Sequence, residues 1–121
     1  TNMTAIVSGT PIAKDADGNT CHLDGISNPD NVTMLTGTNL LFIGEDTSSH
    51  INNVIWSYDV ESKKLTRVLT TPLGAETTSP FWYKNINGFS YMTAVTQHPD
   101  TETVYKGEST VGVLGAIKNL K

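Results

Sequence analysis

The sequence predicts an all-β protein built from about two blades of an antiparallel β-propeller. Short runs of β-branched and aromatic residues recur along the 121 residues and are separated by turns rich in Asn and Gly. No segment carries the apolar period of about 3.6 residues, with caps at both ends, that an amphipathic helix needs. A weak repeat also relates the two halves of the chain. The alternative is a small β-sandwich in which the repeat is accidental.

Composition describes a folded and acidic chain. Hydrophobic residues make up 37% and charged residues 17%, which is typical of globular proteins rather than disordered ones. Twelve acidic residues against eight basic ones give a net charge of −4, so we expect no nucleic-acid partner. No apolar run approaches the roughly 18 residues of a membrane span. The one cysteine, Cys21, excludes an internal disulfide framework and is interpreted as a small buried hydrophobic residue.

Residues 1–24 are expected to form an irregular N-terminal segment. Within it, Asp15, Asp17 and Gly18 resemble part of a calcium-binding loop. An EF-hand loop needs its glycine at the sixth position, and Gly18 falls at the fourth, so we interpret this stretch as an Asp-Gly turn.

The first predicted unit covers residues 25–71. A strand over residues 32–35 follows a polar Asn-Pro-Asp-Asn segment, and an apolar run at 40–43 predicts a second strand. Residues 54–60 are rich in β-branched and aromatic side chains, and residues 65–69 alternate with period two. These two runs, joined by a short polar turn, predict a hairpin.

The second predicted unit covers residues 74–121. A strand at residues 81–83 leads into a turn at 84–88, where Asn-Gly suits a positive φ. Residues 89–95 form the next predicted strand. Residues 111–117 supply another, although two glycines weaken it.

The repeat becomes visible when Pro29 is aligned with Pro80, an offset of 51 residues, close to the 49 that aligns Phe42 with Tyr91. A period near 50 residues made only of strands is typical of propeller blades. Propellers close with about four or more blades. We therefore expect a fragment of a larger domain, whose open sheet edges are covered by the remaining blades or by another chain. The first residue, Thr1, agrees with that expectation because it is not Met.

Oxygen-donating side chains occur in three separate loops. Asp30 precedes the first strand, Glu45 follows the second, and Glu76 opens the second unit; Asn31 and Asp46 are possible further ligands or supporting groups. Loops at strand ends gather around a propeller channel, so these groups can converge there. Carboxylate and amide oxygens suit calcium, or iron(III) where carboxylates bridge. In the alternative interpretation, Asp30 stabilises an Asx turn and the other acids are solvated.

Motifs of nucleotide-binding loops, of zinc proteases and of serine hydrolases are absent. Of the three histidines, His98 ends a strand in Gln-His-Pro and is the candidate catalytic acid, base or phosphate donor. The other interpretation is a polar strand end stopped by Pro99.

An ordered set of short motifs resembles the C-terminal part of the PhoX-type alkaline phosphatase family, which are secreted bacterial β-propeller phosphatases. The motifs are Asn-Pro-Asp-Asn (28–31), Gly-Glu-Asp-Thr (44–47), Asn-Val-Ile-Trp-Ser-Tyr-Asp (53–59), Gly-Ala-Glu-Thr-Thr (74–78) and Gln-His-Pro (97–99). The resemblance covers about residues 25 to 100. It implies an all-β propeller, hydrolysis of phosphomonoester substrates, and a periplasmic or secreted location.

The resemblance also implies a mixed cofactor of Ca²⁺ and Fe³⁺ in the complete protein. By resemblance, Asp30 matches a calcium ligand, Glu45 and Glu76 match acids near the metals, and His98 lies in a motif near the channel. The family's cysteine ligand to iron and its Arg-Pro-Glu motif have no counterpart here. The chain alone is therefore expected to be inactive and to contribute calcium-side ligands and part of the channel wall.

Two other functions remain open at the level of the sequence. One is a non-catalytic β-propeller or β-sandwich binding module with at most one structural calcium. The other is a calcium-dependent sugar or lactone hydrolase on a similar propeller. Hydrolysis of p-nitrophenyl phosphate, with no activity on lactones, would separate the phosphatase from both.

Overall fold

Seven β-strands make up the fold in the computed structural model, which describes residues 2–102, 104 and 106–118. The strands are β1 (Pro29–Met34), β2 (Leu40–Glu45), β3 (Val54–Asp59), β4 (Lys64–Thr70), β5 (Glu76–Ile86), β6 (Phe89–Gln97) and β7 (Thr110–Lys118). The described residues form no helix, so none of them belongs to a helix that could cross a membrane. The expectation of an all-β protein is confirmed.

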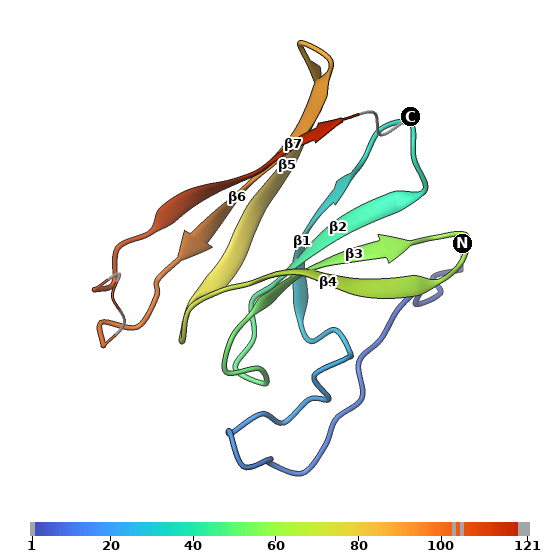
Figure 1. Ribbon diagram of the computed structural model, residues 1–121. Coiled ribbons are helices and arrows are strands. Elements are labelled where there is room, and N and C mark those ends of the chain that lie inside the picture. The colour runs from blue at the N-terminus through green and yellow to red at the C-terminus, as the bar shows by residue number, and fades with distance from the viewer. Residues whose placement is uncertain (1, 103, 105, 119–121) are drawn as a thin grey trace.

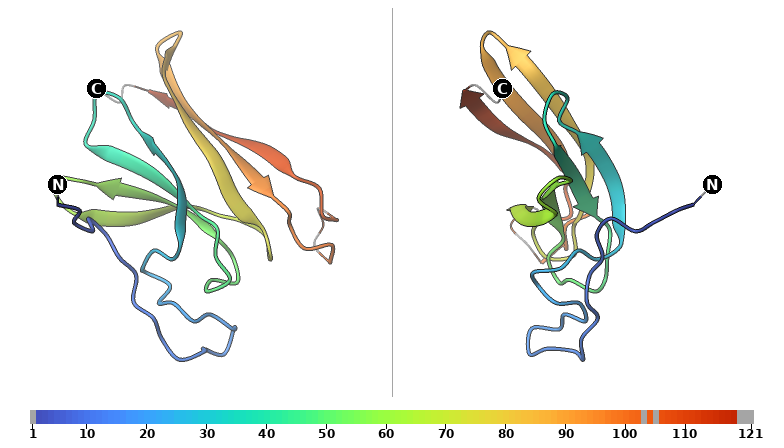
Figure 2. Two further views of the ribbon diagram at one scale, coloured as in Figure 1. Left: turned by 180° about the vertical axis from the view of Figure 1, so that it is seen from behind. Right: turned by 90° about the vertical axis from the view of Figure 1, so that its right-hand side faces the viewer.

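The strands form two antiparallel sheets in simple meander order (Figure 1). The first sheet has four strands in the order β1-β2-β3-β4, and the second has three in the order β5-β6-β7. Strand β5 lies alongside β1 and β2, so the two sheets stack with β5 as the strand nearest the first sheet (Figure 2). The two aligned prolines, Pro29 and Pro80, fall in β1 and β5.

The main hydrophobic core lies between the two sheets. Its buried side chains are Leu35, Phe42, Ile55, Trp82, Met92 and Ala94. Phe42 and Trp82 come from different sheets and meet edge to face, with ring centroids 6.2 Å apart. Because successive side chains of a strand point to opposite faces, only alternate residues of each strand reach this core.

A second core covers the other face of the first sheet. It contains Ile26, Ile43, Val54, Trp56 and Tyr58, with Val7 of the N-terminal segment packed against it. The Tyr58 hydroxyl donates to the carbonyl of Ile6 over 2.7 Å. The N-terminal segment, although irregular as predicted, therefore covers a sheet face. The central strands of the first sheet, β2 and β3, are therefore largely buried on both faces, whereas β1 and β4 stay largely exposed.

Turn chemistry accounts for the irregular segment. The Asn19 side-chain amide donates to the Asp15 carboxylate, and the backbone amides of Asn19, Gly18 and Asp17 donate to it as well; these bonds hold the pKa of Asp15 below its usual value. Gly18 has φ of +107°, a conformation that favours glycine. The Asp-Gly turn interpretation of this stretch agrees with that geometry, and the carboxylate is used by the backbone.

Two strands are longer in the structure than the sequence pattern predicts. The added residues include Glu45 and Glu76, which the sequence pattern had placed in loops. Strand β2 continues past Ile43 to Glu45, and β5 starts at Glu76 rather than at Phe81. Gly44 allows the extension, because a Cβ there would lie 2.6 Å from the Thr77 hydroxyl of β5. The close approach of β2 and β5 keeps both segments extended. Glu45 and Glu76 are therefore strand residues rather than loop residues.

Candidate functional site

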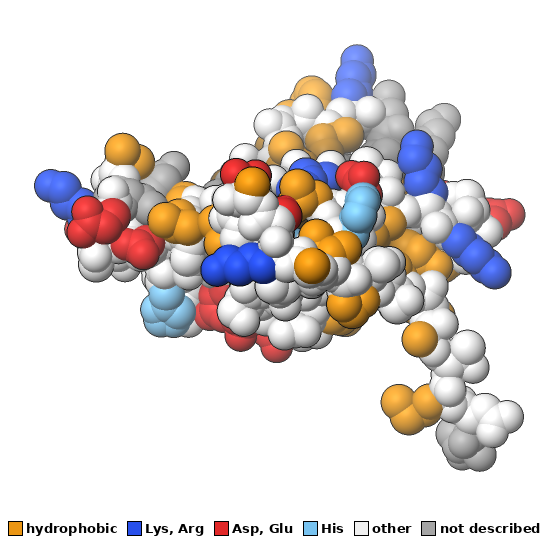
Figure 3. All heavy atoms as spheres, turned by 90° about the horizontal axis from the view of Figure 1, so that it is seen from below, with side chains coloured by type: hydrophobic (Ala, Val, Ile, Leu, Met, Phe, Trp, Pro, Cys, Tyr) orange, Lys and Arg blue, Asp and Glu red, His pale blue; other side chains and the backbone are white. Residues whose placement is uncertain are grey.

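One end of the two stacked sheets gathers the predicted acids. Strand β1 starts where β2 ends, since Pro29 pairs with Glu45. Strand β5 likewise starts where β6 ends, since Glu76 pairs with Gln97. The contact of β5 with β1 and β2 then brings all four strand ends to one end of the molecule. Viewed from that end, Figure 3 shows acidic and histidine side chains at the surface.

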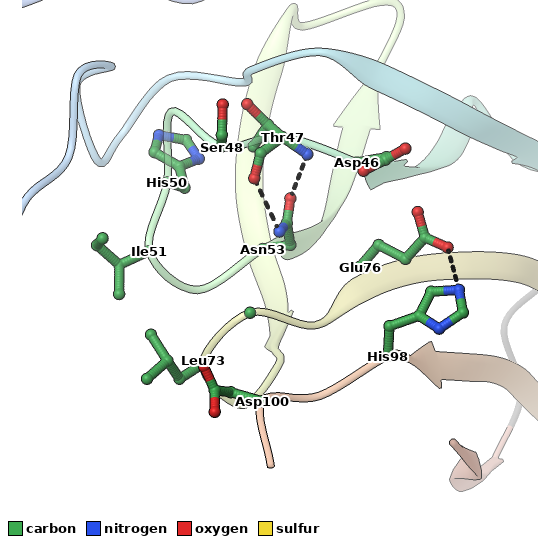
Figure 4. Close-up of a pocket in the computed structure, with 11 residues that line it drawn as sticks. Asp46, Thr47, Ser48, His50, Ile51, Asn53, Leu73, Glu76, His98 and Asp100 are labelled. Carbon is green, nitrogen blue, oxygen red and sulfur yellow. Dashed lines mark hydrogen bonds and ion pairs between the residues drawn. The ribbon is translucent and has the colours of Figure 1, made fainter. Parts of the chain in front are cut away.

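Asp46 and Glu76 are two carboxyl groups that line the same pocket. Asp46 directly follows β2 and Glu76 opens β5, and Figure 4 shows both side chains in one region of a pocket. Burial raises the pKa of Glu76, and a hydrogen bond with Asp46 and the negative charge of Asp46 raise it further. Two carboxylates this close repel each other unless a proton or a cation lies between them.

Asp30 adds negative charge from β1. Its carboxylate also raises the pKa of Glu76, although less than Asp46 does. Asp30 occupies an irregular position of the β1–β2 ladder, where the register shifts between Pro29 and Asn31. The Asn31 side-chain amide donates a hydrogen bond to the Asp30 carboxylate. The side chain of Asp30 is exposed, so its second oxygen faces solvent at the rim of the cluster.

His98 brings an imidazole to the same pocket. It follows β6, and its Nε2 atom lies 3.8 Å from Oε1 of Glu76 (Figure 4). A positive charge on His98 would lower the pKa of Glu76, against the effect of the two aspartates. The side chain of His98 is 72% exposed, whereas that of Glu76 is 21% exposed. The imidazole can therefore reach a ligand from the solvent side.

The pocket around these groups has a volume of about 410 Å³. Asp46, Glu76, His98 and Asp100 are four of its titratable lining residues, and residues of the segment 47–53, which include the buried His50, form another wall. Asn53 fixes that wall, because its side chain bonds the amide and the carbonyl of Thr47 and the carbonyl of Ala75. Sequence reasoning did not single out Asn53 or Asp100, since no motif places them beside the acids.

Glu45 lies outside the cluster, in the second core. Its side chain is fully buried, and both carboxylate oxygens accept hydrogen bonds. The amide of Ser27 and the indole of Trp56 donate to Oε1, each over 2.8 Å. The amide of Val54 donates to Oε2 over 3.1 Å, and Nδ1 of His50 lies 2.9 Å from that oxygen. These contacts make Glu45 a structural centre that ties the N-terminal segment to β2 and β3.

The structure thus brings Asp46, Glu76 and His98 together in one pocket, with Asp30 near enough to raise the pKa of Glu76, and places Glu45 elsewhere. In the ranges described, no three His, Cys, Asp or Glu side chains are already arranged around one point as metal ligands. The fit to a cation rests instead on the Asp46–Glu76 pair, whose mutual repulsion a cation would relieve.

The two tryptophans have structural roles. Trp82 lies in the core between the sheets, and Trp56 lies in the second core with the guanidinium of Arg67 5.1 Å from its ring centroid. Tyr83 instead lies on the uncovered face of the second sheet, 40% exposed. None of the three lines the acidic pocket.

Known proteins supply no further guide to this site. Comparisons with protein-family models, with curated proteins and with solved structures found no match to the chain.

Proposed function

We propose that this chain is the C-terminal part of a metal-dependent phosphomonoester hydrolase of the β-propeller type. In this proposal the two stacked sheets are neighbouring blades, and the end that carries the acids faces the central channel. The alignment of Pro29 with Pro80, and of Phe42 with Tyr91, supports the blade interpretation because each pair falls in corresponding strands, β1 with β5 and β2 with β6. The motif resemblance to PhoX-type alkaline phosphatases supplies the substrate class.

A single observation carries the proposal: Asp46 and Glu76, 30 positions apart in the sequence, follow β2 and open β5, and line one pocket together with His98. A fold stabilised only by apolar packing gains nothing from this arrangement, because like charges at close range destabilise it. A hard divalent cation converts the repulsion into attraction, and carboxylate oxygens are ligands that calcium prefers.

The residues of the cluster then have separate roles. Asp46 and Glu76 would hold Ca²⁺ directly, Asp30 would add charge at the rim, and Asn31 would orient Asp30. A bound cation supplies charge neutralisation for the phosphate oxygens and activation of an oxygen nucleophile. His98 Nε2 accepts a hydrogen bond from the Gln97 side-chain amide over 2.7 Å, so His98 would donate from Nδ1 to a phosphate oxygen on the open side of the pocket. No ligand for Fe³⁺ is assigned to the described residues, and Glu45 is not part of the proposed site.

The first test measures calcium binding by isothermal titration of the 121-residue chain. We expect saturable binding at one site, and a loss of about tenfold or more in affinity in Glu76→Gln, since one of two direct charged ligands is removed. Glu61→Gln is the matched control, because Glu61 is exposed and bonds Asn39 at the opposite end of the first sheet. Equal binding by both variants, or no binding by the parent chain, would contradict the proposal.

The second test measures hydrolysis of p-nitrophenyl phosphate by the longer polypeptide that carries these residues with its remaining blades. We expect turnover that requires calcium and that falls in Asp46→Asn. Calcium binding without turnover would favour the non-catalytic module with one structural calcium. Turnover of lactones instead of phosphate esters would favour the lactone hydrolase.

A further inference from the structure

The first sheet has four strands and the second has three, and the missing strand of the second sheet would lie at its outer edge, beside β7. In the first sheet β4 pairs with the outer edge of β3. In the second sheet β7 corresponds to β3, and among the described residues no strand pairs with the outer edge of β7. An unpaired edge presents a row of backbone donors and acceptors that another strand can satisfy.

The β1 and β4 edges carry protecting residues, whereas β7 carries a charged residue only at its last position, Lys118. Strand β1 begins with Pro29 and Asp30, and β4 carries Lys64 and Arg67. Proline and charged side chains are the usual means by which edge strands avoid pairing. Residues 110–117 of β7 contain neither proline nor a charged residue, and Val111 and Val113 are each 67% exposed. Strand β7 is therefore an edge suited to pairing.

An apolar groove lies directly beside this edge, between β7 and the first sheet. Its volume is about 140 Å³, and it is lined on one side by Ile55 and Leu69 and on the other by Met92, Ala94 and Leu114. Ile55, Met92 and Ala94 also belong to the core between the sheets. The groove is thus the open continuation of an interface that the fold already uses.

We propose that β7 and this groove bind an extended peptide segment, which adds to the second sheet as its fourth strand. The segment runs antiparallel to β7, as β4 does to β3, and carries apolar side chains at alternate positions that enter the groove. Backbone hydrogen bonds to β7 hold the segment, while Leu69 and Leu114 select its inward side chains. This inference is independent of the cation site, which lies in a different pocket.

A second copy of this chain fits the groove less well than such a segment does. If β7 of another copy paired with β7, its inward positions would be Gly112 and Leu114, which pair with Ala94 and Met92, and Ile117, which packs against the core. Gly112 has no side chain to enter the groove, and the register of β7 against β6 shifts between Leu114 and Ile117, so the apolar row is interrupted. Strand β4, by contrast, carries both Val68 and Leu69 packed against the core, and so shows the kind of strand that fills such a position.

The test uses a fluorescein-labelled peptide of residues 62–71, which contains the fourth strand of the first sheet. We expect saturable binding by fluorescence anisotropy, weakened about tenfold or more in Leu114→Lys, since a charge then faces the groove. Val111→Lys is the matched control on the same strand, because Val111 is 67% exposed and does not line the groove. We expect it to bind within about twofold of the parent chain.

Two further measurements keep the outcome decisive. Leu69→Ala changes the opposite wall of the groove without altering β7, and should also weaken binding if Leu114→Lys fails to fold. Hydrogen exchange of the β7 amides should slow when the peptide binds. Absence of saturable binding, equal loss in Leu114→Lys and Val111→Lys, or a dimer in sedimentation that buries β7 and excludes the peptide would each overturn the proposal.

Discussion

Glu45 and Asp46 are neighbours in the chain, yet their carboxylates lie in opposite environments. Glu45 is fully buried and surrounded by donors from Ser27, His50, Val54 and Trp56. Asp46 is exposed and lies against another carboxyl group, that of Glu76. The alternation of side chains at the end of β2 sends the two residues to different faces.

The comparison separates a structural carboxylate from a functional candidate. A buried charge is stable only when its lone pairs are satisfied, and the four groups around Glu45 satisfy them. A carboxylate that faces another carboxylate lowers stability unless something else binds there. If Asp46 and Glu76 hold a cation as proposed, burial alone would single out the wrong acid as the metal ligand. The mark of a cation site is a group of carboxylates with too few hydrogen-bond donors around them to balance their negative charge.

The largest expected effect is that of Glu45→Gln on stability. The amide NH₂ of glutamine cannot accept the hydrogen bonds that a carboxylate oxygen accepts, so at least one buried donor loses its partner. We expect a loss of about 3–5 kcal/mol in the free energy of unfolding, the usual cost of breaking a buried charged network. Urea unfolding followed by tryptophan fluorescence measures it.

Asp46→Asn is the control for that measurement, since it removes the neighbouring charge from an exposed position. Its stability should change by no more than about 0.5 kcal/mol, and any change should be a gain, because repulsion with Glu76 is relieved. Similar losses in both variants would remove the distinction between the two carboxylates.

The second prediction concerns calcium and stability. Calcium at about 100 times its Kd should raise the free energy of unfolding by about 2.7 kcal/mol if it binds only the folded chain. Because the stabilisation requires the Asp46–Glu76 pair, it should fall to about 1.4 kcal/mol or less in Asp46→Asn, as a tenfold or greater loss of affinity implies, and persist in Glu61→Gln. Urea unfolding with calcium and with EDTA provides the measurement. A calcium effect that survives undiminished in Asp46→Asn would place the ion elsewhere.

Much of this fold can be predicted from side-chain alternation. The hairpin of residues 54–60 and 65–69 and the strands at 89–95 and 111–117 are found as β3, β4, β6 and β7. The turn at Asn87 and Gly88 has positive φ at both residues, as the Asn-Gly pair predicts. Local patterns suffice here because each strand has a half-buried face and a polar turn.

The buried environment of Glu45 is harder to predict, although the alternation of apolar side chains along β2 indicates it. Leu41, Ile43 and Glu45 are alternate residues of one strand, and Ile43 and Leu41 belong to the second core. Extending the alternation past Gly44 would have placed Glu45 on that buried face. The polar composition of Gly-Glu-Asp-Thr indicated a loop instead. The donors around Glu45 come from residues up to 18 positions away, and no local pattern reports them.

The third prediction tests one donor to Glu45. Trp56→Phe removes the indole N–H that donates to Oε1 and leaves most of the apolar ring in the second core. We expect a loss of about 2 kcal/mol in the free energy of unfolding, the usual range for a hydrogen bond to a charged group. Thermal and urea unfolding measure it. Calcium affinity should be unchanged, because Trp56 does not line the acidic pocket; a parallel loss of calcium binding would show that the two regions are coupled.

The smallest expected effect is the pH dependence of stability that Glu76 contributes. Its pKa is raised in the folded chain above the ordinary value of 4.5, chiefly by burial and then by Asp46. Between those two pKa values the folded state binds more protons than the unfolded state. The contribution of Glu76 to stability therefore falls as pH rises through that window and is most favourable below it.

Two changes should abolish this slope. Glu76→Gln removes the titrating group, and calcium favours the ionised carboxylate and so lowers its folded pKa toward the unfolded value. The measurement is urea unfolding at a series of pH values, with and without calcium, and Glu61→Gln as the control. Calcium should flatten the profile of the parent chain and leave that of Glu76→Gln unchanged. If calcium changed both profiles equally, the raised pKa of Glu76 would reflect only its burial, and the pair with Asp46 would no longer mark a cation site.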